Sequence, residues 1–320
     1  MRHAPLILAL FLYVLIYLLR VQQGGWEVKV NFFSSLRSGL NLRIESLLPS
    51  PQAQLLSGIL LGERKDLPAS LRLNLRDTST LHIVVVSGQN LTMLAALFLS
   101  LSGIFHRKIA ILASLMAIIF YTILTGAQVP VLRAVIMVVL SYLAIFAGRQ
   151  KDGFWVLLVT AGLMLLINPG WISDLSFQLS FLATFGVVQV APLILKIFKL
   201  LPSFLSQDLA ITISAQLMVI PIIAQSFHQF SIVSIFTNLL VGWSVPFIMI
   251  LGSLMLIFPP LNILTNALLT YFIYVVQFFA SLPFAWEYVG EKSWIVWLGY
   301  YLVLAGFMLS LMYGKNTTRK

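Results

Sequence analysis

The chain has 320 residues, of which 60% are apolar and only 9% are charged. Because a soluble domain carries about a quarter charged residues, this composition excludes an ordinary water-soluble protein. The formal net charge of +10 fits nucleic acid or anionic lipid as a partner, but membrane proteins also gather Lys and Arg in cytoplasmic loops for topological reasons. Cysteine is absent, which excludes disulfides, thiolate metal sites, iron–sulfur clusters and cysteine nucleophiles.

The N-terminus has the order of a secretory signal, a basic residue followed by an apolar run. Arg2 precedes the run from Leu6 to Val21, and no small-residue cleavage site follows it. We therefore expect an uncleaved membrane anchor, with Trp26 at the outer interface.

Apolar stretches of membrane length recur along the rest of the chain and predict an all-α, polytopic bundle with about ten crossings. They lie at residues 5–21, 83–103, 109–126, 130–147, 153–168, 176–195, 209–226, 232–257, 262–283 and 294–313. Segment 232–257 is long and is followed by Pro259 and Pro260, so it is either a tilted helix or a broken pair.

The distribution of charge gives the orientation of this bundle. If Arg2 is cytoplasmic and the loops alternate, the short outer loops contain one basic residue, Lys292. The cytoplasmic side then holds Arg2, Arg107, Lys108, Arg149, Lys151, Lys196, Lys199, Lys315, Arg319 and Lys320. This bias predicts that both termini are cytoplasmic and that the chain is a multi-pass protein of the cytoplasmic membrane.

Residues 22–82 form a longer segment on the outer side. Within it, 52–62 and 67–76 have the spacing of amphipathic helices, with Leu67, Leu71 and Leu75 on one face of the second. We expect both helices to lie in the membrane interface or to cover the entrance of the bundle.

Polar residues at membrane depth are the candidates for function, because each costs a few kcal/mol unless it is partnered or faces water. The densest group is His82, Ser87, Gly88, Gln89 and Asn90, at the outer start of the second crossing. Two interpretations stay open: a broken or re-entrant entry that lines a polar cavity, and a hydrogen-bonded contact between helices.

Arg133 lies about one turn inside its apolar segment. It either projects into a water-filled path, where it can meet phosphates, or snorkels to the outer interface, which is the commoner behaviour. At 100° per residue, Gln178 and Gln189 share one side of their helix and are candidates to face a pore. Further along, Gln216 and Asn238 are amides within apolar segments, and Pro221 is expected to kink its helix and to free a carbonyl.

The sequence shows no arrangement of residues that is typical of a catalytic site. The four histidines show no metal-ligand spacing, and Ser87 and His82 are five residues apart, which does not place them on one helical face. The sequence also has no Walker motif. We expect no enzyme activity, no metal and no cofactor, and any energy for transport has to come from a gradient or a partner.

Several segments, in one order, resemble the ComEC/Rec2 competence proteins. They are Leu60–Arg64, His82–Asn90, Val131–Ala134, Asn168–Pro169, Phe177–Phe181, Gln216, Pro221, Phe230–Ser231 and Asn238–Leu239. The resemblance covers about residues 52–283, with Asn90 at a position where the family usually has a histidine. It implies a membrane anchor and short outer segment at 1–51, a competence membrane domain at 52–314 and a basic cytoplasmic tail at 315–320.

The function implied by this resemblance is a channel that imports single-stranded DNA during natural transformation. The ten candidate residues named above, from His82 to Asn238, would then line the DNA path. The partners implied are single-stranded DNA, membrane lipids, and separate receptor, nuclease and cytoplasmic motor proteins, and a homo-oligomer stays open. The alternative is a permease for a small solute or lipid, which equally needs kinked helices and buried amides.

Overall fold

The structure is a computed structural model that describes residues 4–24, 32–63, 66–84, 88–100, 106–146, 148, 152–198 and 200–313. Apart from one two-stranded sheet, the regular structure of these residues is helical, as the composition predicts for an all-α membrane protein. Contacts divide the chain into two units, which are described separately below. Unit 1 comprises Met1–Phe33 and Leu94–Phe181, and unit 2 comprises Ser34–Met93 and Leu182–Lys320.

Unit 1 is built from helices joined by short, capped turns. Asp152 accepts hydrogen bonds from the N–H groups of Phe154 and Trp155 at the start of one helix, and Asp174 accepts from Phe177 N at the start of another, as its position in the sequence predicts. The helices are α1 (Ala4–Gln23), α7 (Arg107–Leu124), α8 (Val129–Phe146), α9 (Gly153–Ile167), η2 (Pro169–Ser173) and most of α10 (Leu175–Phe185), with the second half of α6 (Gly88–Ser100).

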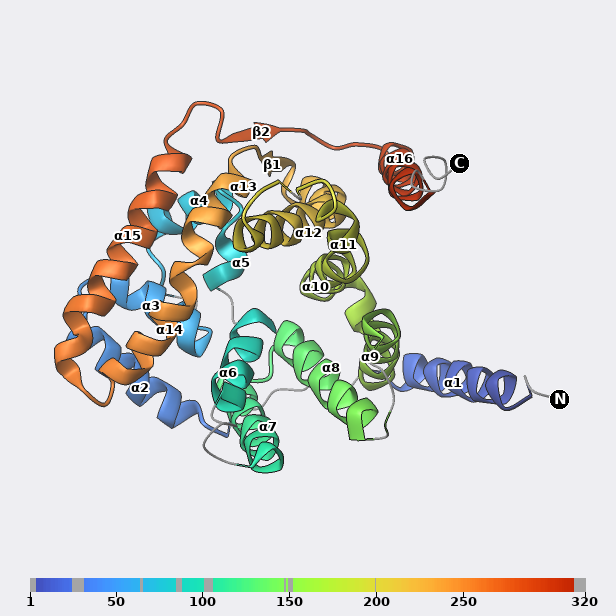
Figure 1. Cartoon of the computed structure of the whole chain (residues 1–320), viewed down its shortest axis with the longest axis horizontal. Coiled ribbons are helices and arrows are strands. Elements are labelled where there is room, and N and C mark those ends of the chain that lie inside the picture. The colour runs from blue at the N-terminus through green and yellow to red at the C-terminus, as the bar shows by residue number, and fades with distance from the viewer. Residues whose placement is uncertain are drawn as a thin grey trace. The chain divides into compact units, whose positions relative to one another are not determined.

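Unit 2 contains two groups of helices. In the first, α14 and α15 pack on α3, and α15 also contacts α4 and α13 (Figure 1). In the second, the π-helix η3 and α11 pack on α12. The elements are α2 (Ser34–Leu47), α3 (Gln52–Leu61), α4 (Ala69–Asp77), α5 (Leu81–Val84), η3 (Gly186–Val190), α11 (Ala191–Ile194), α12 (Ser203–Phe227), β1 (Gln229–Ser231), α13 (Ser234–Gly242), α14 (Ser244–Met255), η4 (Pro259–Leu261), α15 (Asn262–Ala280), β2 (Trp286–Tyr288) and α16 (Trp294–Tyr313).

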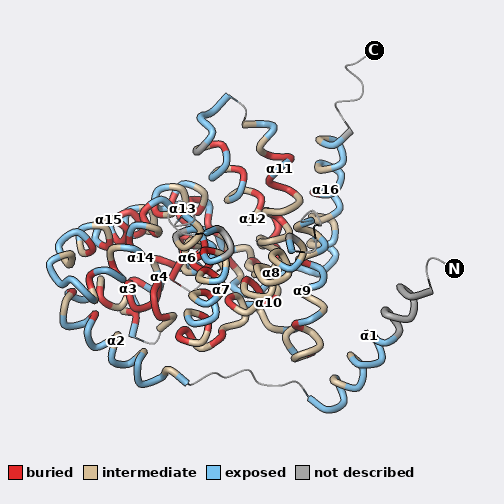
Figure 2. Tube along the Cα trace, turned by 60° about the horizontal axis from the view of Figure 1, so that its bottom comes forward, coloured by how far each residue is buried: buried red, intermediate tan, exposed pale blue. Residues whose placement is uncertain are grey.

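The two helices expected to be amphipathic differ in burial. Helix α4 buries Leu71 and Leu75 and leaves Arg72 and Arg76 exposed, as predicted. Helix α3 is buried from Leu55 through Leu61, so the prediction of an interfacial helix at 52–62 is wrong (Figure 2). The reason is that α2, α5, α14 and α15 all pack around α3, which makes it a core helix.

Fewer helices than the ten predicted have both the length and the apolarity to cross a membrane. Among the described residues these are Leu175–Ile194, Leu205–Phe227, Pro259–Ala280 and Trp294–Met312, with a fifth if a bent pair counts as one span. Helices such as the 15-residue α9 are apolar but only about 22 Å long, against a hydrocarbon core of about 30 Å.

Two expected crossings are described only in part. The first corresponds to the 20-residue helix α1, whose side chains through Phe11 lie outside the described residues. The second corresponds to α5 and α6, and residues 85–87 and 101–105 of that segment lie outside the described residues.

The segment 232–257 is a broken pair, one of the two alternatives derived from its length. Helices α13 and α14 meet at a bend of 41°. Side chains donate to the carbonyls at the break: the Tyr271 hydroxyl to Leu240 O at 2.9 Å and the Ser244 hydroxyl to Val241 O at 2.7 Å. Trp243 Nε1 in turn donates to the Tyr271 hydroxyl at 3.2 Å. The bend therefore has its own hydrogen-bond partners.

Helix α16 supplies the partner that Pro221 removes from α12. Because proline has no N–H, the carbonyl of Leu217, four residues earlier, loses its helical donor. The Tyr300 hydroxyl donates to this oxygen at 2.9 Å, and the Tyr301 hydroxyl donates to Met218 O, also at 2.9 Å. The freed carbonyl predicted from the sequence is thus confirmed. These bonds fix α16, which is otherwise largely exposed in Figure 2, against α12.

We expect Tyr300→Phe to destabilise the protein by about 1 to 3 kcal/mol, because it leaves Leu217 O unpaired in apolar surroundings. In a Pro221→Ala background the new N–H serves that carbonyl, so the same substitution should cost less than about half as much. Unfolding in mixed micelles, followed by tryptophan fluorescence, measures both. Tyr301→Phe is the matched control, since Ile222 still offers an N–H to its acceptor. Equal losses in the two backgrounds would show that the hydroxyl does not replace the missing donor.

A glycine marks the closest approach of η3 to α12. A Cβ at Gly186 would overlap the carbonyl oxygen of Ser214, which is backbone and cannot rotate away. We expect Gly186→Ala to destabilise the protein by about 1 to 3 kcal/mol. Gly299→Ala on α16, where a Cβ meets nothing within 4 Å, should be neutral or stabilising. The same unfolding measurement distinguishes them, and a neutral Gly186→Ala would contradict the tight crossing.

Candidate functional site

In unit 2 an extended segment runs back along an apolar helix. His228 ends α12 with a φ of 56°, the chain reverses through β1, and α13 begins at Ser234. Gln216 Nε2 donates to Ser234 Oγ at 2.6 Å. Gln216 is the central residue of the apolar stretch Leu205–Phe227 and lies about 16 Å from its end. Where α12 crosses a bilayer, the start of α13 therefore reaches the depth of its middle.

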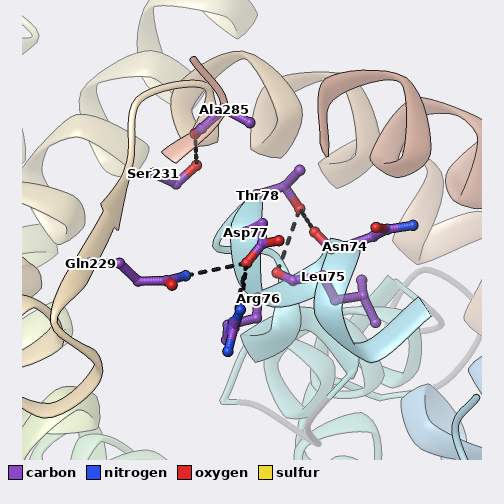
Figure 3. A network of polar contacts seen from close by, with 8 residues as sticks. All are labelled: Asn74, Leu75, Arg76, Asp77, Thr78, Gln229, Ser231 and Ala285. Carbon is purple, nitrogen blue, oxygen red and sulfur yellow. Dashed lines mark hydrogen bonds and ion pairs between the residues drawn. The ribbon is translucent and has the colours of Figure 1, made fainter. Parts of the chain in front are cut away.

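Two contacts hold β1 in this place. It pairs antiparallel with β2, with Phe230 opposite Glu287. On its other side, Gln229 Nε2 donates to Asp77 Oδ1 at 3.3 Å, at the C-terminal end of α4 (Figure 3). Arg76 Nη2 lies 3.1 Å from the same carboxylate oxygen and neutralises it. The strand is thereby anchored to helix α4 as well as to β2.

Polar groups form a chain from the middle of α12 to the segment before β2. Ser234 Oγ, which accepts from Gln216, donates to Ser231 O at 3.1 Å. Ser231 Oγ donates to Ala285 O at 3.2 Å, as Figure 3 shows, and Ile232 N donates to the same oxygen at 3.0 Å. Each buried hydroxyl therefore has a partner, as polar groups in apolar surroundings require.

A cavity of about 220 Å³ lies beside this chain. Its polar lining consists of Gln216, Ser231 and Ser234, and Phe230 supplies an aromatic ring. The remaining lining side chains are aliphatic: Ile213, Leu217, Ile220, Ile232 and Ile235. None of these described lining residues is charged, so the cavity is neutral, largely apolar and equipped with an amide.

In unit 1 the candidate Arg133 is buried. Its side chain belongs to α8, its residue exposure is 9%, and Nε has no hydrogen-bond partner among the described residues. The guanidinium carbon lies 6.0 Å from the centroid of the Phe181 ring, which in turn is 4.4 Å from that of Phe177. The snorkelling interpretation stays a prediction. A cation over an aromatic face gains about 0.5 to 2 kcal/mol, less than the cost of burying an unpaired charge.

The group from His82 to Asn90 is divided. Asn90 is buried and its Nδ2 donates to Ile59 O at 3.1 Å, a bond between α6 and α3 that agrees with the helix-contact interpretation. His82 is exposed, and its ring nitrogen lies 2.9 Å from Ser79 O. Gly88 begins α6. Ser87 and the side chain of Gln89 lie outside the described residues.

The remaining amides have different local roles. Gln178 Nε2 donates to Ile172 O at 2.8 Å, which ties α10 to the preceding turn. Gln189 lies in the π-helix η3, so the uniform 100° spacing that placed it beside Gln178 does not hold through this region. Asn238 on α13 has a buried Oδ1 that lacks a hydrogen-bond partner among the described residues.

Sequence reasoning missed the anchor between Asp77 and Gln229. The two residues are 152 positions apart. Neither of them is a polar residue inside an apolar stretch, which was the signal that identified the other candidates. Tyr300 and Tyr301 were missed as well, although two adjacent tyrosines in an apolar helix of high hydropathy were a signal that buried acceptors had to be near.

Known proteins resemble this chain over most of its length. The family described as Competence protein matches residues 59–313. ComE operon protein 3 of Bacillus subtilis (strain 168) is 30% identical over 216 residues, which are 67% of this chain and 27% of that protein. The uncharacterized protein YcaI of Escherichia coli (strain K12) is 26% identical over 240 residues, 69% of this chain and 30% of that protein.

An uncharacterized protein of Aquifex aeolicus (strain VF5) is 31% identical over 231 residues, 69% of this chain and 53% of that protein. The chain thus spans between about a quarter and about half of the length of these relatives. No solved structure matches it significantly. The matched region runs from α3 to the end of α16 and contains the cavity, the Asp77 anchor and Arg133, and the chain belongs to the Competence protein family.

Proposed function

We propose that the chain forms a channel that carries single-stranded DNA across the cytoplasmic membrane in natural transformation. The family match over residues 59–313 carries this proposal, because it covers the helices of membrane length together with the polar groups between them. The name of the Bacillus subtilis relative points to competence for that protein.

The physical requirements of such a path agree with features of each unit. A single strand needs hydrated polar walls, surfaces for base stacking and a modest positive potential, without tight recognition of sequence. In unit 2 the cavity beside Gln216 offers an amide and an aromatic ring at the middle of α12. In unit 1 the buried Arg133 offers a positive charge that lacks a partner on Nε among the described residues.

The membrane topology is part of the proposal. The charge bias of the loops supports cytoplasmic positions for both termini. Helix α1 and the apolar helices α6, α7, α8 and α9 would complete a count of about ten if the bilayer thins around the shorter ones or flanking residues reach the interface. Hydrolysis of one DNA strand and the force for movement would come from separate nuclease and motor proteins, with a separate receptor outside, and a homo-oligomer is compatible with this arrangement.

One observation favours a second function, a permease for a small solute or lipid. The broken pair of α13 and α14 has the geometry of the discontinuous helices that form binding sites in transporters. The two functions differ in what happens to DNA, so genetic tests separate them.

Deletion of the gene is expected to abolish transformation while DNA binding at the cell surface persists. The reason is that a channel acts after surface binding and before recombination. Transformant frequency and retention of labelled DNA on washed cells measure the two steps, with the restored gene as the control. Normal transformation in the deletion strain rules out the channel.

Arg133→Met tests the role of the buried cation. A methionine of similar length removes an unpaired charge from apolar surroundings, so stability should stay equal or rise. Uptake of labelled DNA should fall by about 10-fold or more, as expected for loss of a contact to phosphate worth about 1.5 to 3 kcal/mol. Lys196→Gln removes one exposed charge and is the control. Unchanged uptake, or a fall in uptake together with unfolding, would assign Arg133 to packing.

A further inference from the structure

We infer that the cavity beside Gln216 is a subsite for a single nucleobase of the strand in transit, an inference that rests on the proposed function and names the part of the strand this site contacts. The cavity has a volume of about 220 Å³, room for about seven water molecules. This is the scale of one ring system.

The neutral walls of the cavity favour a nucleobase over a phosphate as the group that it binds. The described lining residues are neutral, and a phosphate moved among aliphatic side chains without a cation would lose its hydration uncompensated. A nucleobase has the opposite character, with two apolar faces and a polar edge. Phe230 supplies an aromatic wall, and stacking on such a ring tolerates any base because every base has a π-face.

The hydrogen bonds leave one amide available to the edge of the base. The hydroxyl hydrogens are already used, since Ser234 Oγ donates to Ser231 O and Ser231 Oγ donates to Ala285 O. Gln216 uses one N–H on Ser234. It keeps a second N–H, and no described residue bonds to its carbonyl oxygen. The amide therefore has one donor and one acceptor for which no described residue is a partner.

An adjacent donor and acceptor suit all four bases. Each base carries a neighbouring donor and acceptor on its Watson–Crick edge, in one order or the other, and an amide can accept either order when the base turns over. A channel that imports DNA of any sequence needs such tolerance. A lipid chain, in contrast, would have no use for the amide or for the hydroxyl chain behind it.

The walls of the cavity are held in place by contacts with other elements of unit 2. Its β1 wall is held by the pairing with β2 and by the bond of Gln229 to Asp77, and the start of α13 is held by Ser234. A rigid wall beside the central residue of α12 gives each passing base the same contact. This contact lies beside the middle of α12, where the apolar surroundings would otherwise be least favourable for the polar edge of a base.

The test compares two fluorescent 20-mers on the full chain in lipid nanodiscs, a thymidine strand and an abasic strand with the same sugar and phosphate groups. Fluorescence anisotropy should show that the wild type binds the thymidine strand about 10-fold more tightly or better. Ile213→Phe fills the cavity and should abolish this preference while weak binding of both strands remains. Ile211→Phe, an exposed position on the same helix, is the matched control and should retain it.

Gln216→Leu keeps the volume of the side chain but removes the amide, and it should reduce the preference several-fold even if Ile213→Phe fails to fold. Equal binding of the two strands by the wild type would overturn the base subsite and leave the channel standing. A preference retained in both Ile213→Phe and Gln216→Leu would place base contacts elsewhere and overturn it as well. If neither strand binds at any concentration, the proposed DNA channel itself fails with the subsite.

Discussion

Every backbone carbonyl and N–H that leaves the helical ladder in apolar surroundings needs a partner within the protein, and this constraint explains most of the specific contacts in unit 2. Pro221 frees the carbonyl of Leu217, and Tyr300 on α16 supplies its donor. The break between α13 and α14 is served by Tyr271 and Ser244 in the same way. Helices that look like independent apolar spans are thus linked by side-chain hydroxyls to irregular points on their neighbours.

The extended strand beside α12 is the largest departure from helical structure. Its backbone pairs with β2, Ser231 O accepts from the Ser234 hydroxyl, and Ile232 N donates to Ala285 O. The side chain of Gln229 reaches Asp77. The distant partners come from two separate parts of the sequence, residues 285–288 and Asp77, so the irregular segment depends on long-range contacts. The largely apolar cavity beside Gln216, with three polar lining residues, lies next to this segment.

Sequence reasoning was accurate where the cause is local. Pro221 was expected to free a carbonyl, and the length of 232–257 together with the prolines after it allowed a broken pair, because each depends on residues near in the sequence. It failed where the burial of a helix or an irregular helical geometry determines the structure. Leu55 through Leu61 have the spacing of a surface helix but are enclosed by four other helices. The π-helix at Gln189, which begins at Gly186 and is followed by Pro192, breaks the uniform α-helical spacing that was assumed. Partners 80 or more residues apart, such as Tyr300 and Leu217, leave no trace in a single sequence.

On the proposed function, Arg133 and the cavity beside Gln216 contact different parts of a DNA strand, the phosphates and the bases, and this arrangement suits passage of the strand. A polyanion held by many cations would bind too tightly to move, since affinity rises steeply with the number of phosphates neutralised. Conduction needs contacts that are favourable enough for entry and weak enough for release. On the proposed function, the buried Arg133 in unit 1 meets the phosphates, and the neutral cavity in unit 2 meets the bases without adding charge. On the same proposal, a site that stacks on any base and hydrogen-bonds its edge offers a comparable contact to each nucleotide, so that no sequence becomes a strong trap.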